Sequence, residues 1–350
     1  MPSLLSSIDE IDAAWLQSVF SAAGKDIPVI RKLRIEALGD GKTGTTVKAV
    51  LEYEGNGSVD PATAPSSVVC KFHPADPNQF EIVKSTGIFL AEANAQKLLA
   101  EHSEAAVPEC YFVAVADDAG EFNLVCEDLS GFCVPGDQIA GCSIDDARTA
   151  MAELAKFHRQ FWNEPRLESV EWAAQRPEFL DNALEMILDR IKRLLSADQY
   201  EVVIQAVPRI HDWLELQPIN KTLIHNDCKI DNILFDHRNA KEPKAYLIDF
   251  AMVSVGDAAS DIAYFLTSSL SPENRLACEL DLLKLHSGEI AKKDPSHTFE
   301  NAVQAYRDNI VSSLFLTLFF AVHVTDTPEA RLLLKTLLER NCAAVEHWTP

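Results

Sequence analysis

The chain has 350 residues, a length that favours two lobes or domains over one. Its composition, 47% hydrophobic and 24% charged, is typical of a soluble globular protein with a sizeable core. The net charge of −22 argues against a general affinity for nucleic acid or for anionic membrane surfaces.

The N-terminal half predicts a sheet with helices beside it. Apolar residues recur at helical spacing in residues 9–22, which predicts an opening helix. Alternating or apolar runs between Gly-rich and Pro-rich breaks then predict five strands: Val29–Ala37, Thr45–Tyr53, Ser67–Phe72, Glu109–Ala116 and Glu121–Cys126. A helix is expected from about Ser85 to His102, inserted between the third and fourth strands.

The chain after Gly131 is predominantly helical in pattern. Helices are expected over residues 143–162, 178–196, 199–216, 257–269, 273–291, 298–323 and 328–346. The exception is residues 223–250, where two short strands flank a polar segment. The sequence therefore predicts an α+β protein with a β-rich lobe (1–126), a helical lobe (127–350) and a nucleotide cleft at the seam.

Cysteine usage and terminal composition indicate the compartment. The eight cysteines are scattered singly, without the C-x-x-C pairs of zinc sites, which favours reduced thiols. The N-terminus lacks a basic region followed by an apolar run, so no secretory signal is expected. The apolar stretch Ile310–Val324 is too short and too interrupted by Ser and Thr to span a bilayer. We therefore expect a cytoplasmic protein that has no membrane partner.

The most informative segment runs from Leu223 to Phe235. It places Asp227 five residues before Asn232, and Asp249 follows the next short apolar strand. Phosphoryl transfer from a nucleoside triphosphate needs this set: one carboxylate for the acceptor proton, and an amide and a second carboxylate for Mg²⁺. Asp227 or Asn232 alone would suit turn capping, but the three residues together favour catalysis.

Two further residues of this segment have a predicted role. Lys229, two residues after Asp227, suits a γ-phosphate contact and a solvated loop charge equally well. His225 is expected to brace the loop through hydrogen bonds rather than to transfer protons.

The first lobe supplies an independent indication of nucleotide binding. Lys71 ends an apolar strand and Glu92 lies within the inserted helix, as in pairs that grip the α- and β-phosphates of ATP. A strand-edge Lys and an exposed helical Glu would be the ordinary alternative. The turn that contains Gly39, Gly41 and Gly44 joins the first two strands, and its backbone amides could approach phosphates closely.

The linker and the segment after Asp249 complete the candidate residues. Glu127 could present a carbonyl and Leu129 an amide to adenine, although an ordinary strand exit would have the same sequence. Asp257 is expected to cap a helix, and Asp261 to brace the catalytic loop from a buried position. His158 is predicted to be a packing residue.

These motifs together resemble the aminoglycoside phosphotransferase and choline kinase superfamily, and within it the ecdysteroid-kinase-like branch. The resemblance covers about residues 35–270 and depends on His225-Asn-Asp, Asn232, Leu247-Ile-Asp-Phe250, the segment 255–266, Cys126-Glu-Asp-Leu-Ser130 and the segment 154–162. It implies a two-lobed, protein-kinase-like fold and an ATP- and Mg²⁺-dependent kinase. The acceptor would be a hydroxylated small molecule such as a sterol, an antibiotic or an amino alcohol.

The chain departs from the family pattern at two points. Asn226 stands where the family usually has Gly, and Asn tolerates unusual backbone angles better than most residues. Only seven residues separate Asp249 from Asp257, which leaves no room for a long activation loop and disfavours a protein substrate. A catalytically silent pseudokinase is the alternative, and the sequence leaves the acceptor, protein partners and the choice between ATP and GTP open.

Overall fold

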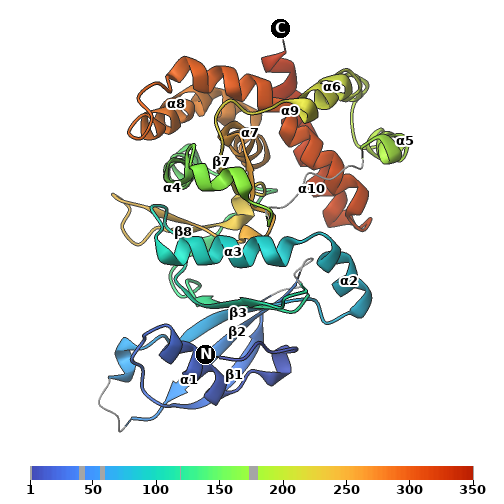
Figure 1. Ribbon diagram of the computed structural model, residues 1–350. Coiled ribbons are helices and arrows are strands. Elements are labelled where there is room, and N and C mark those ends of the chain that lie inside the picture. The colour runs from blue at the N-terminus through green and yellow to red at the C-terminus, as the bar shows by residue number, and fades with distance from the viewer. Residues whose placement is uncertain (1, 39–43, 56–59, 119, 173–179, 350) are drawn as a thin grey trace.

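The computed structural model describes residues 2–38, 44–55, 60–118, 120–172 and 180–349. They form a β-rich lobe near the N-terminus and a helical lobe near the C-terminus (Figure 1). This is the α+β, two-lobed architecture that the sequence predicts, whereas the proposed boundary between residues 126 and 127 stays a prediction. None of the helices in the described part of the chain is long and apolar enough to cross a membrane.

The small lobe is built on an antiparallel sheet with the strand order β1-β2-β3-β5-β4. The strands are β1 (Ile30–Ala37), β2 (Thr45–Tyr53), β3 (Ser67–Phe72), β4 (Cys110–Val115) and β5 (Phe122–Glu127). All five predicted strands are therefore confirmed. Successive side chains of a strand point to opposite faces, so β3 buries Val68, Cys70 and Phe72 on one face and turns Lys71 to the other.

Helix α1 (Ala13–Ala22) covers the face of the sheet opposite Lys71. Asp12 precedes it, and its side chain accepts a hydrogen bond from the Trp15 N–H and so caps the helix. Its buried residues, among them Leu16 and Phe20, join Phe72 and its strand neighbours in a core of their own. The predicted opening helix is thus confirmed, and its burial fixes which side of β3 faces the other lobe.

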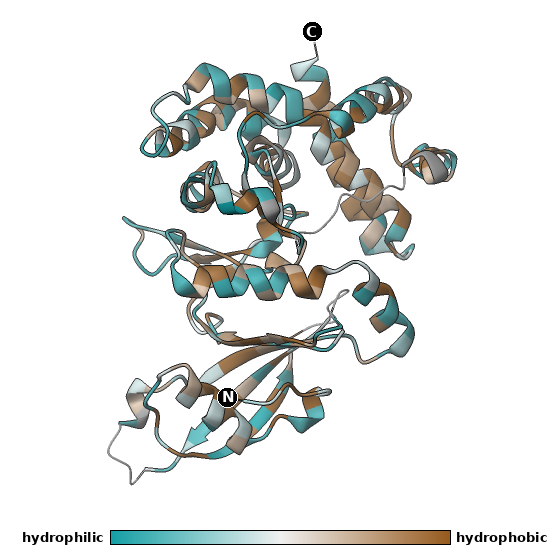
Figure 2. Cartoon of the chain, viewed as in Figure 1, coloured by the Kyte–Doolittle hydropathy of each residue, from teal (hydrophilic) through white to brown (hydrophobic). Residues whose placement is uncertain are grey.

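The helix expected from about Ser85 to His102 is confirmed as α3 (Ile88–Glu101), and a further helix that the sequence analysis did not predict, α2 (Pro77–Ser85), lies before it. Helix α2 is capped by Asp76, and Gly87 then turns the chain with a φ of 72° before α3 begins. This left-handed conformation favours glycine and ends the first helix. Hydrophobic and hydrophilic residues alternate along α3 (Figure 2), which lies between the sheet and the large lobe (Figure 1).

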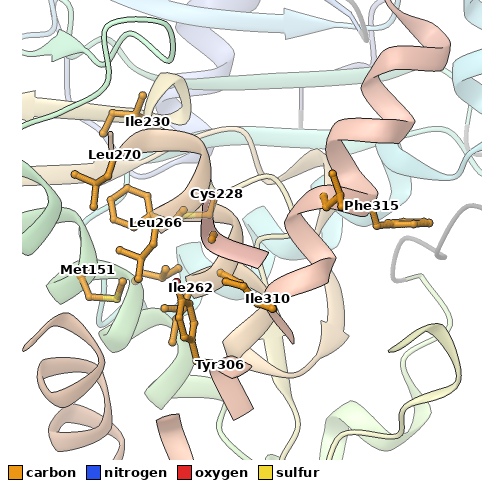
Figure 3. Close-up of a cluster of buried hydrophobic side chains, with 14 of the residues drawn as sticks. Met151, Cys228, Ile230, Ile262, Leu266, Leu270, Tyr306, Ile310 and Phe315 are labelled. Carbon is orange, nitrogen blue, oxygen red and sulfur yellow. The ribbon is translucent and has the colours of Figure 1, made fainter. Parts of the chain in front are cut away.

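Helices make up most of the large lobe. They are α4 (Ile144–Phe161), α5 (Leu180–Ile191), α6 (Ala197–Glu215), α7 (Ala258–Ser269), α8 (Pro272–Ile290), α9 (Phe299–His323) and α10 (Pro328–Trp348). All seven correspond to predicted helices; α5 ends earlier than expected, and the predicted start of this helix at 178 lies outside the described residues. Every residue of α7 is buried. Figure 3 shows Ile262 and Leu266 of α7 beside Met151, Ile310 and Tyr306 in the main core.

Short strands hold the segment between α6 and α7. Strand β7 (Thr222–Ile224) pairs with β10 (Ser254–Gly256), and β8 (Ile233–Asp236) pairs with β9 (Lys244–Leu247) and with β6 (Val134–Pro135). The sequence predicted two strands in residues 223–250, whereas β7, β8 and β9 lie there, so one of these three was missed. Strands β6 and β10 were missed as well, because at two and three residues they are too short for an alternating pattern. The loops between these strands contain the candidate catalytic residues.

Candidate active site

The loop after β7 is held in place by Asp261, in the first turn of α7. The two oxygens of its carboxylate accept hydrogen bonds from the His225 N–H (2.6 Å) and from the Asn226 N–H (2.7 Å). Asp261 is 1% exposed, and its Oδ2 lies 3.1 Å from Nε2 of the buried His158. A carboxylate that accepts several hydrogen bonds inside the protein fixes the groups around it. Asp261 therefore makes the bracing contacts that the sequence predicts, and His158 takes part in them.

Two residues of the site have left-handed backbone conformations. Asn226 has a φ of 62° and Asp249 a φ of 64°. Asn and Asp adopt this conformation more readily than other residues with a Cβ. The φ value explains how Asn can stand at the position where the superfamily usually has Gly, and it agrees with the expected tolerance of Asn226.

The two oxygens of the Asp227 carboxylate differ in their hydrogen-bond partners. Its Oδ2 accepts hydrogen bonds from Lys229 Nζ (2.6 Å) and from Asn232 Nδ2 (3.0 Å). Its Oδ1 lies 3.4 Å from the Tyr264 hydroxyl, a weaker contact. Oδ1 is thus the oxygen with more freedom to accept a proton from another hydroxyl group.

Asn232 is oriented by the loop in which it lies. Its amide nitrogen also donates to the Asp227 main-chain carbonyl (2.9 Å), so its side-chain oxygen is the atom available for a cation. The main-chain carbonyl of Asn232 accepts a hydrogen bond from the Ile248 N–H (3.1 Å). The residue before Asp249 is therefore tied directly to Asn232.

Asp249 meets the small lobe through Lys71. Lys71 Nζ lies 2.7 Å from Asp249 Oδ1 and 2.9 Å from Glu92 Oε1, so the sheet, α3 and the catalytic segment meet at one ammonium group. Burial lowers the pKa of Lys71, but attraction to Asp249 and then to Glu92 raises it overall. The predicted Lys71–Glu92 pair is present, and Asp249 joins it.

The two carboxyl groups that contact Lys71, those of Asp249 and Glu92, differ in their pKa. Burial would raise the pKa of Asp249, yet attraction to Lys71 holds it at about 2. Burial raises the pKa of Glu92 to about 7, because the loss of water outweighs attraction to a lysine that Asp249 shares. Asp249 is thus the more permanent anion of the two.

These residues fit a magnesium ion. Mg²⁺ prefers hard oxygen ligands and is bound by one or two protein groups, with water and phosphate oxygens completing its shell. Asn232 and Asp249 offer one amide oxygen and one carboxylate. In the part of the chain that the structure describes, no group of three or more His, Cys, Asp or Glu gathers as a dedicated metal cage.

The structure describes only part of the Gly-rich turn between β1 and β2. Gly39 and Gly41 lie outside the described residues. At Gly44 a Cβ would lie 2.5 Å from the main-chain oxygen of Phe72, so glycine lets β2 begin close to β3. The predicted contact of Gly39, Gly41 and Gly44 with phosphate stays a prediction.

The linker leaves β5 along a fixed path. Glu127 is the last residue of β5, and the Leu129 carbonyl accepts hydrogen bonds from the N–H groups of Phe132 and Cys133. Between them, Asp128 lies 2.7 Å from Lys48 Nζ of β2. The linker is thus anchored to the sheet, while the roles of Glu127 and Leu129 in adenine binding stay predictions.

Tyr264 and Gln138 belong to this cluster although the sequence analysis did not select them. Tyr264 lies three residues after Asp261, a spacing that puts both on one side of α7, and this could have indicated it. The Gln138 N–H donates to Asp231 Oδ1 (2.6 Å), and Arg340 of α10 donates to the Gln138 carbonyl (2.7 Å). No local pattern predicts that second contact, because 202 residues separate the two positions.

A narrow cavity lies beside the catalytic loop. Asn226, Asp261 and Met252 line it on the side of the loop, and Ser312, Phe315 and Phe319 line it from α9. It therefore adjoins the residue next to Asp227 and is bounded by α9 of the helical lobe.

Comparisons with known proteins agree with this geometry. Among solved structures, a putative aminoglycoside phosphotransferase from Ralstonia eutropha has a TM-score of 0.54 at 14% identity, covering 96% of each chain. Choline kinase from Cryptosporidium parvum has a TM-score of 0.51 at 11% identity and covers 98% of this chain and 91% of its own. Amicoumacin kinase in complex with AMP-PNP, Ca²⁺ and Ami has a TM-score of 0.51 at 15% identity and covers 95% of this chain and 94% of its own.

The predicted protein-kinase-like fold and the superfamily are thereby confirmed, while the ecdysteroid-kinase-like branch stays a prediction. A comparison with curated proteins found no match. The model of the phosphotransferase enzyme family matches residues 63–289, from before β3 to the end of α8. Because this match spans more than half of the chain, the protein belongs to the phosphotransferase enzyme family.

Proposed function

We propose that this phosphotransferase is an ATP- and Mg²⁺-dependent kinase that phosphorylates a hydroxyl group of a small molecule. The observation that carries the proposal is the meeting of Lys71, Glu92 and Asp249 at the junction of the lobes. Asp227 and Asn232 lie on the loop after β7, and the Asn232 side chain donates a hydrogen bond to the Asp227 carboxylate. Phosphoryl transfer requires such a set of charged and amide groups in a fixed arrangement.

Each residue has a role in this proposal. Asp227 accepts the proton of the attacking hydroxyl, and Lys229 beside it contacts the γ-phosphate. Lys71, held by Glu92, binds the α- and β-phosphates. A bound Mg²⁺ would neutralise charge on the phosphates, and Asn232 and Asp249 would hold it.

Binding of the nucleotide base and phosphates extends into the small lobe. We place adenine at the linker, with the Glu127 carbonyl and the Leu129 amide as its partners. The turn with Gly39, Gly41 and Gly44 would lie over the phosphates. The amicoumacin kinase complex, which contains AMP-PNP and Ca²⁺, supports the use of a nucleotide with a divalent cation in this fold.

The segment after Asp249 favours a small acceptor over a protein. It consists of one 3-10 turn (Phe250–Met252) and β10, which pairs with β7. Asp257 then caps α7 at once, by accepting a hydrogen bond from the Ala259 N–H. A segment of this length, tied down by a strand pair and a helix cap, offers no extended surface for a peptide.

The remaining finer assignments belong to the same proposal. We place the protein in the cytoplasm and in the ecdysteroid-kinase-like branch, with sterols, antibiotics and amino alcohols as candidate acceptors. The pseudokinase alternative depended on Asn226. Its left-handed backbone and its bond to Asp261 support an intact catalytic loop instead.

One assay tests the proposal. ATP consumption is measured with Mg²⁺ across a library of hydroxylated metabolites, for the wild type and for Asp227→Ala. We expect at least one acceptor to stimulate ATP consumption in the wild type alone, with a phosphorylated product. ATP binding without any Asp227-dependent phosphorylation would favour the pseudokinase.

A further inference from the structure

The cavity between the catalytic loop and α9 has the size of a single water molecule. Its volume open to water is about 20 Å³. One buried water needs roughly 10–15 Å³ of such volume and two to four polar partners. We infer that the cavity holds one water molecule, which ties Ser312 of α9 to the catalytic loop and makes Ser312 a positioning residue for Asp227. The inference rests on the proposed kinase function and deepens it.

Ser312 supplies the first partner of this water. It lines the cavity and is 1% exposed, and its hydroxyl oxygen has no hydrogen-bond partner among the described residues. The neighbouring Ser313 is buried as well, but its hydroxyl group contacts that of Thr267. Burial of a hydroxyl group without a partner costs free energy, which a hydrogen bond to water recovers. A water molecule at Ser312 therefore stabilises the fold.

Asp261 supplies the second partner. An ionised carboxylate has about four acceptor sites on its two oxygens. Three groups occupy such sites: the N–H of His225, the N–H of Asn226 and Nε2 of His158. Because Asp261 also lines the cavity, an O–H of the water can use the site that remains. The water thereby joins the contacts that hold the catalytic loop.

Asn226 supplies the third partner. It lines the cavity from the side of the loop, and the described residues form no hydrogen bond with its side chain. The superfamily usually has Gly here, which could not reach the water. The side-chain oxygen of Asn226 can accept the second O–H of the water, while the water oxygen accepts from Ser312. The departure of Asn226 from the family pattern thus has a physical role.

The rest of the lining confines the water to these three groups. Ser260 is the other polar residue, and its hydroxyl group already donates to the Asp257 carbonyl. The remaining wall residues are apolar or aromatic: Trp213, Ile224, Met252, Phe315, Leu316 and Phe319. The water therefore bridges α9, α7 and the catalytic loop.

The loop that the water braces contains the proposed catalytic base. Asp227 follows Asn226 directly, and its Oδ1 is the less occupied carboxylate oxygen. The rate of phosphoryl transfer depends on how accurately such a group is held, because a small displacement lowers it strongly. Ser312 acts through the water, Asp261 and Asn226, and not on the acceptor itself.

Hydrogen exchange tests the water without any acceptor. The N–H groups of His225 and Asn226 donate to Asp261, so their protection from exchange reports how often the loop opens. Ser312→Ala should lower both protection factors about fivefold, since a hydrogen bond of the network is lost. If the cavity is dry, the variant removes a hydroxyl group that has no partner, and protection stays equal or rises. That result overturns the inference.

A double-mutant cycle with Asn226→Gly locates the effect. In this background the water has already lost one partner, so Ser312→Ala should lower the protection of His225 only about twofold. Ser313→Ala is the matched control, because its hydroxyl group contacts Thr267 and not the cavity. Its effect should be the same in both backgrounds. Equal effects of Ser312→Ala in the two backgrounds contradict a shared water.

The positioning role has a kinetic readout. With an accepted alcohol, Ser312→Ala should lower kcat about fivefold and leave the KM for ATP unchanged, because the loop and not the nucleotide site loses a contact. An unchanged kcat overturns the positioning role. A crystal structure of the wild type should also show one water within hydrogen-bond distance of Ser312 Oγ, and a side chain that fills this position contradicts the inference.

The outcomes separate the two proposals. If Ser312→Ala loses protection while no alcohol gives a product that depends on Asp227, the water stands and the kinase function falls. If such a product forms while Ser312→Ala keeps its protection, the inference alone is overturned.

Discussion

Lys71 Nζ and Asp249 Oδ1 lie 2.7 Å apart and join the two lobes, although the residues are 178 positions apart in the chain. The pair forms because β3 turns Lys71 away from the α1 side of the sheet and the left-handed backbone of Asp249 turns its carboxylate towards the small lobe. Glu92 completes the contact from α3. The contact between the lobes therefore depends on the charges of Lys71, Asp249 and Glu92.

The charge of Glu92 should make stability depend on pH. Its pKa is raised from 4.5 to about 7, so the group contributes stability fully below about pH 4.5 and loses it as the pH rises through about 7. Glu92→Gln removes this titration. We expect the free energy of unfolding of Glu92→Gln, relative to wild type, to rise by on the order of 3 kcal/mol between about pH 4.5 and pH 8.

Urea denaturation of the nucleotide-free protein at a series of pH values measures this effect. Glu81→Gln, an exposed position on α2, serves as the control and should show no such trend. A difference between Glu92→Gln and wild type that is constant with pH would show that Glu92 is fully ionised in the fold.

The backbone of Asn226 predicts different effects on stability for two small substitutions. With a φ of 62°, Asn226→Gly relieves any strain and should stay within about 0.5 kcal/mol of the wild-type free energy of unfolding. Asn226→Ala keeps a Cβ in the left-handed conformation without the polar side chain that lets Asn tolerate it, and it should cost about 1 kcal/mol more than the Gly variant. Thermal unfolding measures both, with Asn78→Ala on the surface of α2 as control. Equal stability of the Gly and Ala variants would exclude a strained loop.

The Tyr264 hydroxyl should affect turnover more than nucleotide binding. It lies 3.4 Å from Asp227 Oδ1, the oxygen that we assign to the acceptor proton. Tyr264→Phe should lower kcat about fivefold, roughly 1 kcal/mol for the loss of one long hydrogen bond to the carboxylate, and leave the KM for ATP unchanged. Tyr246→Phe on β9 is the matched control. A change in the KM for ATP with kcat unaffected would place Tyr264 on the nucleotide side instead.

Much of the fold could be predicted from local patterns. The strands of the small lobe alternate or are bounded by Gly and Pro, and the helices after Ser143 carry apolar residues at helical spacing, so the elements were found close to their bounds. Helix α2 was missed even though Asp76 and Pro77 form a start signal, because its sequence is short and polar. Strands β6 and β10 are too short to have a periodicity.

The site was predictable where a chemical template fixes spacing along the chain. Asp227, Asn232 and Asp249 fall within one segment and were selected in this way, and their catalytic roles stay predictions. Tyr264 was missed because its position depends on how α7 packs against the loop. Packing of this kind is a tertiary property that a single sequence does not show.

Asp227 tests the central claim most directly. Wild type and Asp227→Ala are supplied with ATP, Mg²⁺ and an accepted alcohol, and phosphorylated product is quantified by mass spectrometry beside the Kd for ATP; Asp117→Ala in a surface turn is the control. We predict a fall in kcat of at least ~10²-fold for Asp227→Ala, with the Kd for ATP nearly unchanged. Equal product from Asp227→Ala and wild type would contradict the account.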